Sequence, residues 1–356
     1  MRIAILNDSH CGARNSADIF LDYFATFYSD IFFPYCDKHA IKQIIHLGDF
    51  YDQRKLVNFK ALHHNRKTFL EPMRERGMTM DIIPGNHDVF YRNTNDLCSL
   101  KELLGYFVEN VNIVMTPRVM DYAGCKIALL PWINQENYND SIQFIQNCQA
   151  SIIGAHLELD GFDMAKGVAS HGGMDPAIFN RFEQVWTGHY HTKSEKGNIS
   201  YLGTQYEMTW SDADDPKYFH VFDTDTREIT AVRNPHTIFT KIIYNDKIDS
   251  AIPVVTSATV KRKLVKVLVV AKTDLFGFDR FIDNLQKLEP FELKIAENYE
   301  EFLGANVVVD SSIETVSDTA LLMDSYVEAV DTLLDKTKIK QQLRELHAEA
   351  QNLEIV

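Results

Sequence analysis

Five short polar motifs, each directly after a segment predicted to be a buried strand, constrain this chain more than any other feature. They are Asp8-x-His10, Gly48-Asp49, Gly85-Asn86-His87-Asp88, Ala155-His156 and Gly188-His189-Tyr190-His191. Residues i and i+2 of an extended segment project to the same side, so the D-x-H and H-x-H spacings let both side chains reach one ligand. A lone histidine at a strand end is weak evidence. Five such motifs in order predict one site at the edge of a sheet.

The side chains in these motifs are imidazoles, carboxylates and one amide. This nitrogen and oxygen donor set, without thiolate, favours Mn, Fe or Zn, and its oxygen content favours Mn. The chain has five scattered cysteines with no CxxC pair: Cys11, Cys36, Cys98, Cys125 and Cys148. The spacing indicates neither a disulfide framework nor a cysteine zinc site, and we expect a reducing cytoplasm.

The first part of the chain alternates strands with helices. We expect strands at 2–6, 43–47 and 79–83, with helices at about 18–39 and 58–76 between them. From about residue 110 the pattern becomes β-rich, with strands expected at 112–115, 126–130, 151–155, 184–187, 199–202, 218–222 and 229–232. This pattern predicts an α/β (α+β, four-layer) sandwich, in which two mixed β-sheets are flanked by helices.

The character of the sequence changes near Asn234-Pro235, which predicts three parts. They are a main domain at 1–235, a small α/β capping domain at 236–305 and a helical C-terminal tail at 306–356. The capping domain is expected to run strand–helix–strand, at 264–271, 278–288 and 291–295. In the tail, an apolar stripe recurs at helical spacing, at Leu322, Tyr326, Val330 and Leu333. Such a stripe is either internal packing or a docking face for a partner, and spacing does not decide between them.

The bulk composition is that of an ordinary globular protein, with 45% hydrophobic and 24% charged residues among 356. No apolar run reaches the roughly 20 residues that span a bilayer, so no membrane partner is expected. The N-terminus does not resemble a signal peptide. The net charge of −14 counts against nucleic-acid binding by the chain alone, because such binding depends largely on basic side chains that neutralise phosphates.

The motif order D-x-H, GD, GNHD, H, GHxH resembles the signature of calcineurin-like metallophosphoesterases and spans roughly the first 210 residues. The resemblance implies a site for two divalent metal ions. One ion would be held by Asp8, His10, Asp49 and His191. The other would be held by Asp49, Asn86, His156 and His189, so that Asp49 bridges the two. His87 matches the family's catalytic histidine, which binds no metal.

In such a site two cations about 3.5–4 Å apart activate a bridging water for attack on phosphorus. His87 would stabilise the developing charge or protonate the leaving oxygen. Asp88 either orients a neighbouring imidazole or caps a turn. Archaeal and eukaryotic relatives commonly place a histidine where Asp52 stands, which leaves the role of Asp52 open. His171 lies between the last two metal motifs, where it either contacts substrate or is a simple surface histidine.

The segment G-D-F-Y-D at 48–52 is similar to one in bacterial SbcD nucleases and T-even-type phage recombination nucleases. Similarity to the phage branch continues at 130–132, 155–162, 185–189, 201–204 and 214–216. It implies an Mn²⁺-dependent DNA exonuclease and endonuclease, the nuclease subunit of an SbcCD-like complex in double-strand-break processing, recombination and replication. The implied partners are DNA ends (duplex, single-stranded or hairpin) and an SbcC-like coiled-coil ATPase. The nuclease would be a homodimer within a heterotetramer, in the cytoplasm or, for a virus, the host cytoplasm.

Two other functions remain open on the sequence. One is a phosphodiesterase or phosphatase that acts on a small molecule or nucleotide. The other is a non-catalytic binding module, which is disfavoured because every expected ligand residue is present. The C-terminal region discriminates between the first alternative and the nuclease. A small-molecule enzyme has no evident need of a capping domain, here expected to face DNA, followed by an amphipathic tail.

Overall fold

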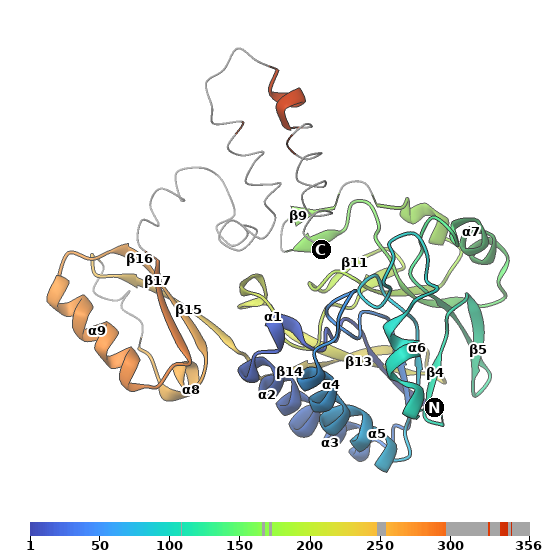
Figure 1. Ribbon diagram of the computed structural model, residues 1–356, viewed down its shortest axis with the longest axis horizontal. Coiled ribbons are helices and arrows are strands. Elements are labelled where there is room, and N and C mark those ends of the chain that lie inside the picture. The colour runs from blue at the N-terminus through green and yellow to red at the C-terminus, as the bar shows by residue number, and fades with distance from the viewer. Residues whose placement is uncertain are drawn as a thin grey trace.

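The computed structural model describes residues 1–107, 109–165, 168–170, 173–247, 254–296, 327, 335–340 and 343. Most of them form a two-sheet body, in which two six-stranded β-sheets lie face to face with helices on their outer sides (Figure 1). A separate three-stranded sheet follows in the chain. The predicted pair of mixed sheets flanked by helices is thus observed.

The first sheet combines a parallel core with an antiparallel edge. Its strands, in spatial order, are β14 (Ile229–Asn234), β13 (Lys217–Asp223), β1 (Arg2–Leu6), β2 (Gln43–His46), β3 (Thr79–Ile82) and β4 (Val111–Ile113). Strands β1 to β4 run parallel, and β13 and β14 join them antiparallel. The helices between these strands are α1 (Ala13–Ser16), α2 (Asp18–Phe27), α3 (Phe33–Lys38), α4 (Phe59–Asn65), α5 (Glu71–Glu75) and α6 (Ser99–Leu103).

The second sheet is built in the same way, with parallel strands at its centre. Its order is β11 (Ser194–Lys196), β12 (Ile199–Tyr201), β10 (Gln184–Gly188), β7 (Ile152–His156), β6 (Cys125–Leu130) and β5 (Arg118–Tyr122). Helix α7 (Tyr138–Asn147) packs on its outer side, where Ile145 is buried among strand residues. A short pair, β8 (Asp163–Ala165) and β9 (Val168–Ala169), lies outside both sheets.

Burial on both faces explains the near-continuous apolar sequence of β1. Ile3 and Ile5 pack into the core between the two sheets, whereas Ala4 and Leu6 pack under the helices. Strands β6 and β7 alternate in the same manner, so that Ile127 and Leu129 face the first sheet. Helices, sheet, sheet and helix therefore make the four expected layers.

The two long predicted helices are each interrupted by a wider, π-type turn. Residues Tyr28–Phe32 separate α2 from α3, and residues Arg66–Leu70 separate α4 from α5. In both cases the helix that follows has proline in its first turn, Pro34 or Pro72. Proline has no backbone N–H and cannot bond to the carbonyl four residues before it. The wider turn lets a different N–H group bond to that carbonyl.

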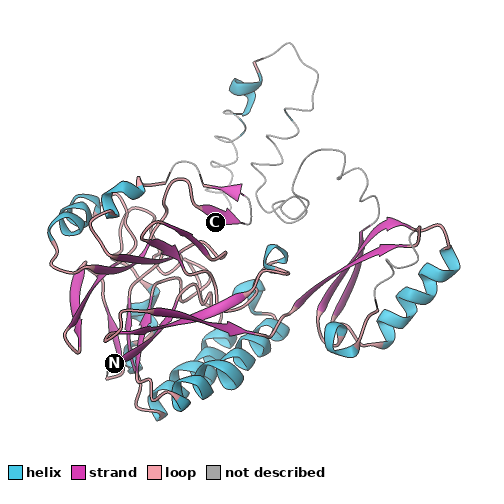
Figure 2. Cartoon of the chain, turned by 180° about the vertical axis from the view of Figure 1, so that it is seen from behind, coloured by secondary structure: helices cyan, strands magenta, loops and turns pink. Residues whose placement is uncertain are grey.

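The small sheet consists of β15 (Phe239–Asn245), β16 (Leu264–Ala271) and β17 (Glu292–Ala296), all parallel. Helices α8 (Ser257–Val260) and α9 (Leu275–Lys287) accompany it, and it stands beside the two-sheet body (Figure 2). The expected strand–helix–strand is present, but β15 is an additional strand. The apolar stripe expected in the tail lies outside the described residues. Within the described part of the chain, no helix has the length and apolar character needed to cross a bilayer.

Candidate metal centre

The predicted ligands converge at one edge of the two-sheet body. Parallel strands β1, β2 and β3 end there, as do the parallel strands β7 and β10 of the other sheet. The seven predicted ligands lie at the last residue of β7 or in the loops that follow the other strands: Asp8, His10, Asp49, Asn86, His156, His189 and His191. We call these seven side chains the metal centre. Each is largely or fully buried although each is polar, and buried polar groups need partners.

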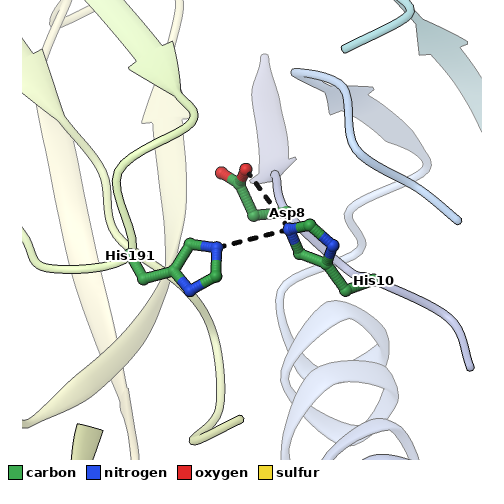
Figure 3. Close-up of side chains that lie close together, drawn as sticks. All are labelled: Asp8, His10 and His191. Carbon is green, nitrogen blue, oxygen red and sulfur yellow. Dashed lines mark hydrogen bonds and ion pairs between the residues drawn. The ribbon is translucent and has the colours of Figure 1, made fainter. Parts of the chain in front are cut away.

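One ligand group combines Asp8, His10 and His191, whose donor atoms all lie within 4.8 Å of one another. Figure 3 shows His191 approaching from the second sheet toward the loop that carries the other two. The Nε2 atom of His10 lies 3.3 Å from Nε2 of His191 and 3.9 Å from Oδ1 of Asp8. The three side chains thus point at a common position.

A second group combines Asp49, His156 and His189, and Asn86 lies between the imidazoles. The Oδ1 atom of Asn86 is 3.0 Å from Nε2 of His156 and 2.9 Å from Nδ1 of His189. Oδ2 of Asp49 lies 3.3 Å from Nε2 of His156. The same oxygen lies 3.7 Å from Nε2 of His10, in the first group. One carboxylate oxygen therefore faces both groups, as expected for a bridging ligand.

His87 lies beside these groups and makes a third set with His10 and Asp49, whose donor atoms also lie within 4.8 Å of one another. Asp52 holds the ring of His87. Its Nδ1 is 2.5 Å from the backbone oxygen of Asp52, and its imidazole ring centroid is 4.8 Å from that of His10. The carboxylate of Asp52 lies 3.4 Å from Nδ1 of His10. Asp52 therefore contacts both rings, through its backbone for one and its side chain for the other.

Asp88 contacts backbone amides, which corresponds to the turn-capping alternative. Its carboxylate accepts hydrogen bonds from the backbone N–H groups of Phe50, Tyr51 and Gly85 at 3.0–3.1 Å. These bonds tie the loop after β2 to the loop after β3. Burial raises the pKa of Asp88 to about 7. His171 lies outside the described residues.

The backbone at the metal centre adopts costly conformations. Positive φ angles occur at Asp8 (46°), His10 (39°), Asp49 (54°) and His189 (94°). Left-handed backbone at non-glycine residues costs of order 1–3 kcal/mol each and is concentrated at functional sites. Glycines permit the closest approaches. A Cβ atom on Gly85 would lie 2.2 Å from Oδ1 of Asp49, and one on Gly188 would lie 2.7 Å from Oδ2 of Asp8.

The electrostatics of the centre are those of a site built for cations. Burial disfavours charge on His10, but Asp52, Asp49 and Asp8 raise its pKa to about 9. For His156 burial is likewise outweighed, chiefly by Asp49, and its pKa is also about 9. Burial would raise the pKa of Asp49, yet the surrounding imidazoles hold it well below the usual range. These carboxylates and nitrogens fit divalent ions, which replace protons on such donors.

Lys217 and Trp132 contact residues of the metal centre, although neither was predicted from the sequence to be a site residue. The Lys217 ammonium donates to the backbone oxygen of His191 at 3.1 Å and to the carboxylates of Asp212 at 2.6 Å and Asp215 at 2.8 Å. Its carbonyl contact fixes the loop that carries His191. Trp132 packs its indole ring against the imidazoles of His156 and His189. The sequence carries a signal for each, because both lie in or beside segments that resemble the phage nucleases.

A model of the calcineurin-like phosphoesterase family matches residues 1–216. This match covers more than half of the chain, so the chain belongs to that family and is a metal-dependent phosphoesterase. Over 318 residues it is 30% identical to exonuclease subunit 1 of Enterobacteria phage T4, covering 89% of this chain and 90% of the relative. The family, fold class and enzyme class predicted from the sequence are confirmed, as is the resemblance to the phage branch.

Two solved structures align with parts of the chain at low similarity. An archaeal phosphodiesterase is 14% identical and covers 66% of this chain and 100% of its own, with a TM-score of 0.33. A protein of unknown function from Aquifex aeolicus is 16% identical and covers 55% of this chain and 82% of its own, with a TM-score of 0.26. Both TM-scores are low, so neither likeness supports an inference about this chain.

Proposed function

We propose that this protein is an Mn²⁺-dependent DNA nuclease with exonuclease and endonuclease activity. The observation that carries the proposal is the convergence of seven nitrogen- and oxygen-bearing side chains into two groups that share one Asp49 oxygen. The similarity to a phage exonuclease subunit over most of both chains supports DNA as the substrate. A phosphatase or phosphodiesterase for a small molecule remains the alternative outcome of the test.

In this proposal Asp8, His10 and His191 hold one divalent ion, and Asn86, His156 and His189 hold the other, with Asp49 bridging. Two ions bound there supply an activated water and a clamp on the phosphate oxygens. His87 acts on the phosphate without binding a metal ion. The Nδ1 atom of His87 is engaged with the Asp52 carbonyl, so its Nε2 atom is left to act on the phosphate. That nitrogen stabilises negative charge or protonates the leaving oxygen.

We further propose that the protein works with an SbcC-like coiled-coil ATPase, as a homodimer within a heterotetramer in the cytoplasm or, for a virus, the host cytoplasm. The three parts expected from the sequence would then divide the work. Residues 1–235 cleave, residues 236–305 face DNA and residues 306–356 bind the ATPase. The phage relative is named as a subunit, which favours a partner protein. The net charge of −14 favours a partner that contributes to DNA binding, because such binding depends largely on positive charge.

One experiment tests the metal and the substrate together. Purified protein is stripped with a chelator, and Mn²⁺ or Mg²⁺ is restored before labelled linear duplex DNA or an aryl phosphodiester is added. We expect DNA cleavage to return far better with Mn²⁺, because Mg²⁺ prefers oxygen ligands and keeps its waters. Full activity in Mg²⁺ alone would contradict the Mn²⁺ assignment. Rapid turnover of the aryl ester with intact DNA would instead favour the small-molecule enzyme.

A further inference from the structure

A cavity of about 470 Å³ opens beside the second ligand group. His156, a proposed metal ligand, lines it together with Trp132. The indole ring of Trp132 lies 5.4 Å from the imidazole of His189 and 5.8 Å from that of His156, measured between ring centroids. The cavity and the second ligand group therefore share a wall. A molecule in the cavity would adjoin a phosphate held at the metal centre.

The walls of this cavity suit a flat, uncharged group. Ile133, Leu157 and Met174 supply apolar surface, and Tyr138, which is 48% exposed, lies at the rim. Among the described residues, no lysine or arginine lines the cavity, and Glu158 is the one acidic residue of that lining. The described lining therefore offers a phosphate no cation apart from the metal-side histidine. An aromatic ring would find apolar and aromatic contacts, which are the usual means of binding an unpaired base.

The polar groups of the cavity divide into a fixed part and an adaptable part. The Asn134 side chain is committed to the protein, because it donates to Asn95 at 2.8 Å and accepts from the backbone of Glu136 at 3.0 Å. Gln135 and Asn139 lie on the exposed rim. A side-chain amide both donates and accepts hydrogen bonds, so it can meet the edge of any base. The lining can therefore stack against a base without selecting one base over another.

We propose that this cavity binds the base of the nucleotide whose phosphate lies at the metal centre, with Tyr138 and Trp132 as its aromatic contacts. The proposal rests on the proposed nuclease function and specifies its substrate. A base reaches the cavity only after it leaves the stack of a duplex. The protein therefore cleaves preferentially at nucleotides that are unpaired, such as those of frayed ends and single strands, where leaving the stack costs least.

Binding of single nucleotides gives the direct test. Mn²⁺-loaded protein is titrated calorimetrically with deoxynucleoside 3′- and 5′-monophosphates and with the corresponding deoxyribose phosphates, which lack a base. We expect at least one nucleotide isomer to bind about 10-fold or more tightly than its baseless counterpart, since stacking typically contributes that much. Tyr138→Ala should remove most of this difference, and Tyr138→Phe should retain it. Tyr91→Ala, at a tyrosine with a similar exposed fraction of 50% outside this cavity, is the matched control.

Cleavage of DNA gives an independent second measurement. Single-stranded oligonucleotides with one abasic position should show a raised KM and little change in kcat when that position meets the metal centre. In Tyr138→Ala the abasic and the intact oligonucleotides should have similar KM values. Equal binding of nucleotides and sugar phosphates by the wild-type protein would overturn the base-binding cavity. If the wild-type protein preferred nucleotides to sugar phosphates but did not cleave DNA, the nuclease function would be overturned and the base-binding role of the cavity would stand.

Discussion

Asp52 shows how one residue can serve two functions through different atoms. Its backbone oxygen accepts from Nδ1 of His87, while its carboxylate lies 3.4 Å from Nδ1 of His10. A carboxylate on the far nitrogen of a metal-binding imidazole fixes the ring and makes it a better ligand. The backbone contact does not depend on the side chain. A substitution at this position can therefore separate metal binding from the placement of His87.

Asp52→Ala should weaken metal binding by about 10- to 100-fold, the usual effect of removing a partner of a ligating histidine. At saturating Mn²⁺ the variant should keep most of its kcat, because the backbone oxygen still holds His87. Calorimetric Mn²⁺ titration and steady-state kinetics measure the two quantities. Asp283→Ala, at an exposed carboxylate on α9, is the control for a lost negative charge. A large fall in kcat at saturating metal would show that the Asp52 carboxylate also acts in the reaction.

His87→Ala should keep both metal ions and lose about 10²- to 10⁴-fold in hydrolysis rate, as expected for a group that acts on protons or charge. Asp49→Ala should lose metal, because its oxygen is the one shared by both ligand groups. Metal content of the purified variants, measured by elemental analysis, distinguishes the two. If His87→Ala also lost one ion, the assignment of His87 to the phosphate alone would be wrong.

At the scale of elements, the segment after β12 links the metal centre to the small sheet. The hydroxyl of Tyr206 donates to the backbone oxygen of Ser9 at 2.6 Å, between two of the proposed ligands. The next residue, Glu207, accepts from the backbone N–H groups of Ile238 at 2.7 Å and Phe239 at 2.9 Å, where β15 begins. The carboxylate is almost fully buried. Glu207 therefore anchors the start of the small sheet to the two-sheet body.

Replacing Glu207 with glutamine should make stability less dependent on pH. Burial raises the pKa of Glu207 from 4.5 to about 7, so the folded protein binds this proton more tightly than the unfolded chain. The resulting stabilisation is complete below the unfolded pKa and is lost as pH rises through about 7. The free energy of unfolding of the wild type, relative to Glu207→Gln, should fall by up to about 3 kcal/mol over that range.

Urea denaturation at a series of pH values measures this difference. Glu75→Gln, at an exposed carboxylate in α5, controls for the loss of one negative charge. Parallel pH profiles for the wild type and Glu207→Gln would show that Glu207 titrates alike in the folded and unfolded states.

Strands with clear apolar runs were the most predictable elements. Residues 2–6 and 264–271 are strands with the expected bounds, because runs of buried aliphatic residues between polar loops have few alternatives. Strand β15 was not predicted. Its run Phe239–Asn245 mixes apolar and polar residues without a clear apolar core, and the strand is defined by its pairing with β16. The roles of Asp52 and Lys217 also required three dimensions, because each acts on a residue brought near by another loop.

At the scale of the whole molecule, the acidic balance shapes how the protein meets DNA. A net charge of −14 repels a polyanion, and bound divalent ions offset it only locally. Affinity for DNA depends largely on cationic side chains that neutralise phosphates. The isolated chain should therefore hold duplex DNA weakly. Tight and processive action is expected of a complex in which a partner supplies positive charge.

The C-terminal residues are the part of the chain that we assign to that partner. The apolar stripe expected there needs a surface that buries it, and none of the five metal motifs lies in this part of the sequence. Deleting all residues after Asp310 should leave Mn²⁺-dependent cleavage of single-stranded or frayed DNA intact and abolish association with the coiled-coil ATPase. Co-purification and cleavage of labelled oligonucleotides measure the two outcomes. A truncated chain that co-purifies with the ATPase at undiminished yield would assign the stripe to the enzyme's own packing instead.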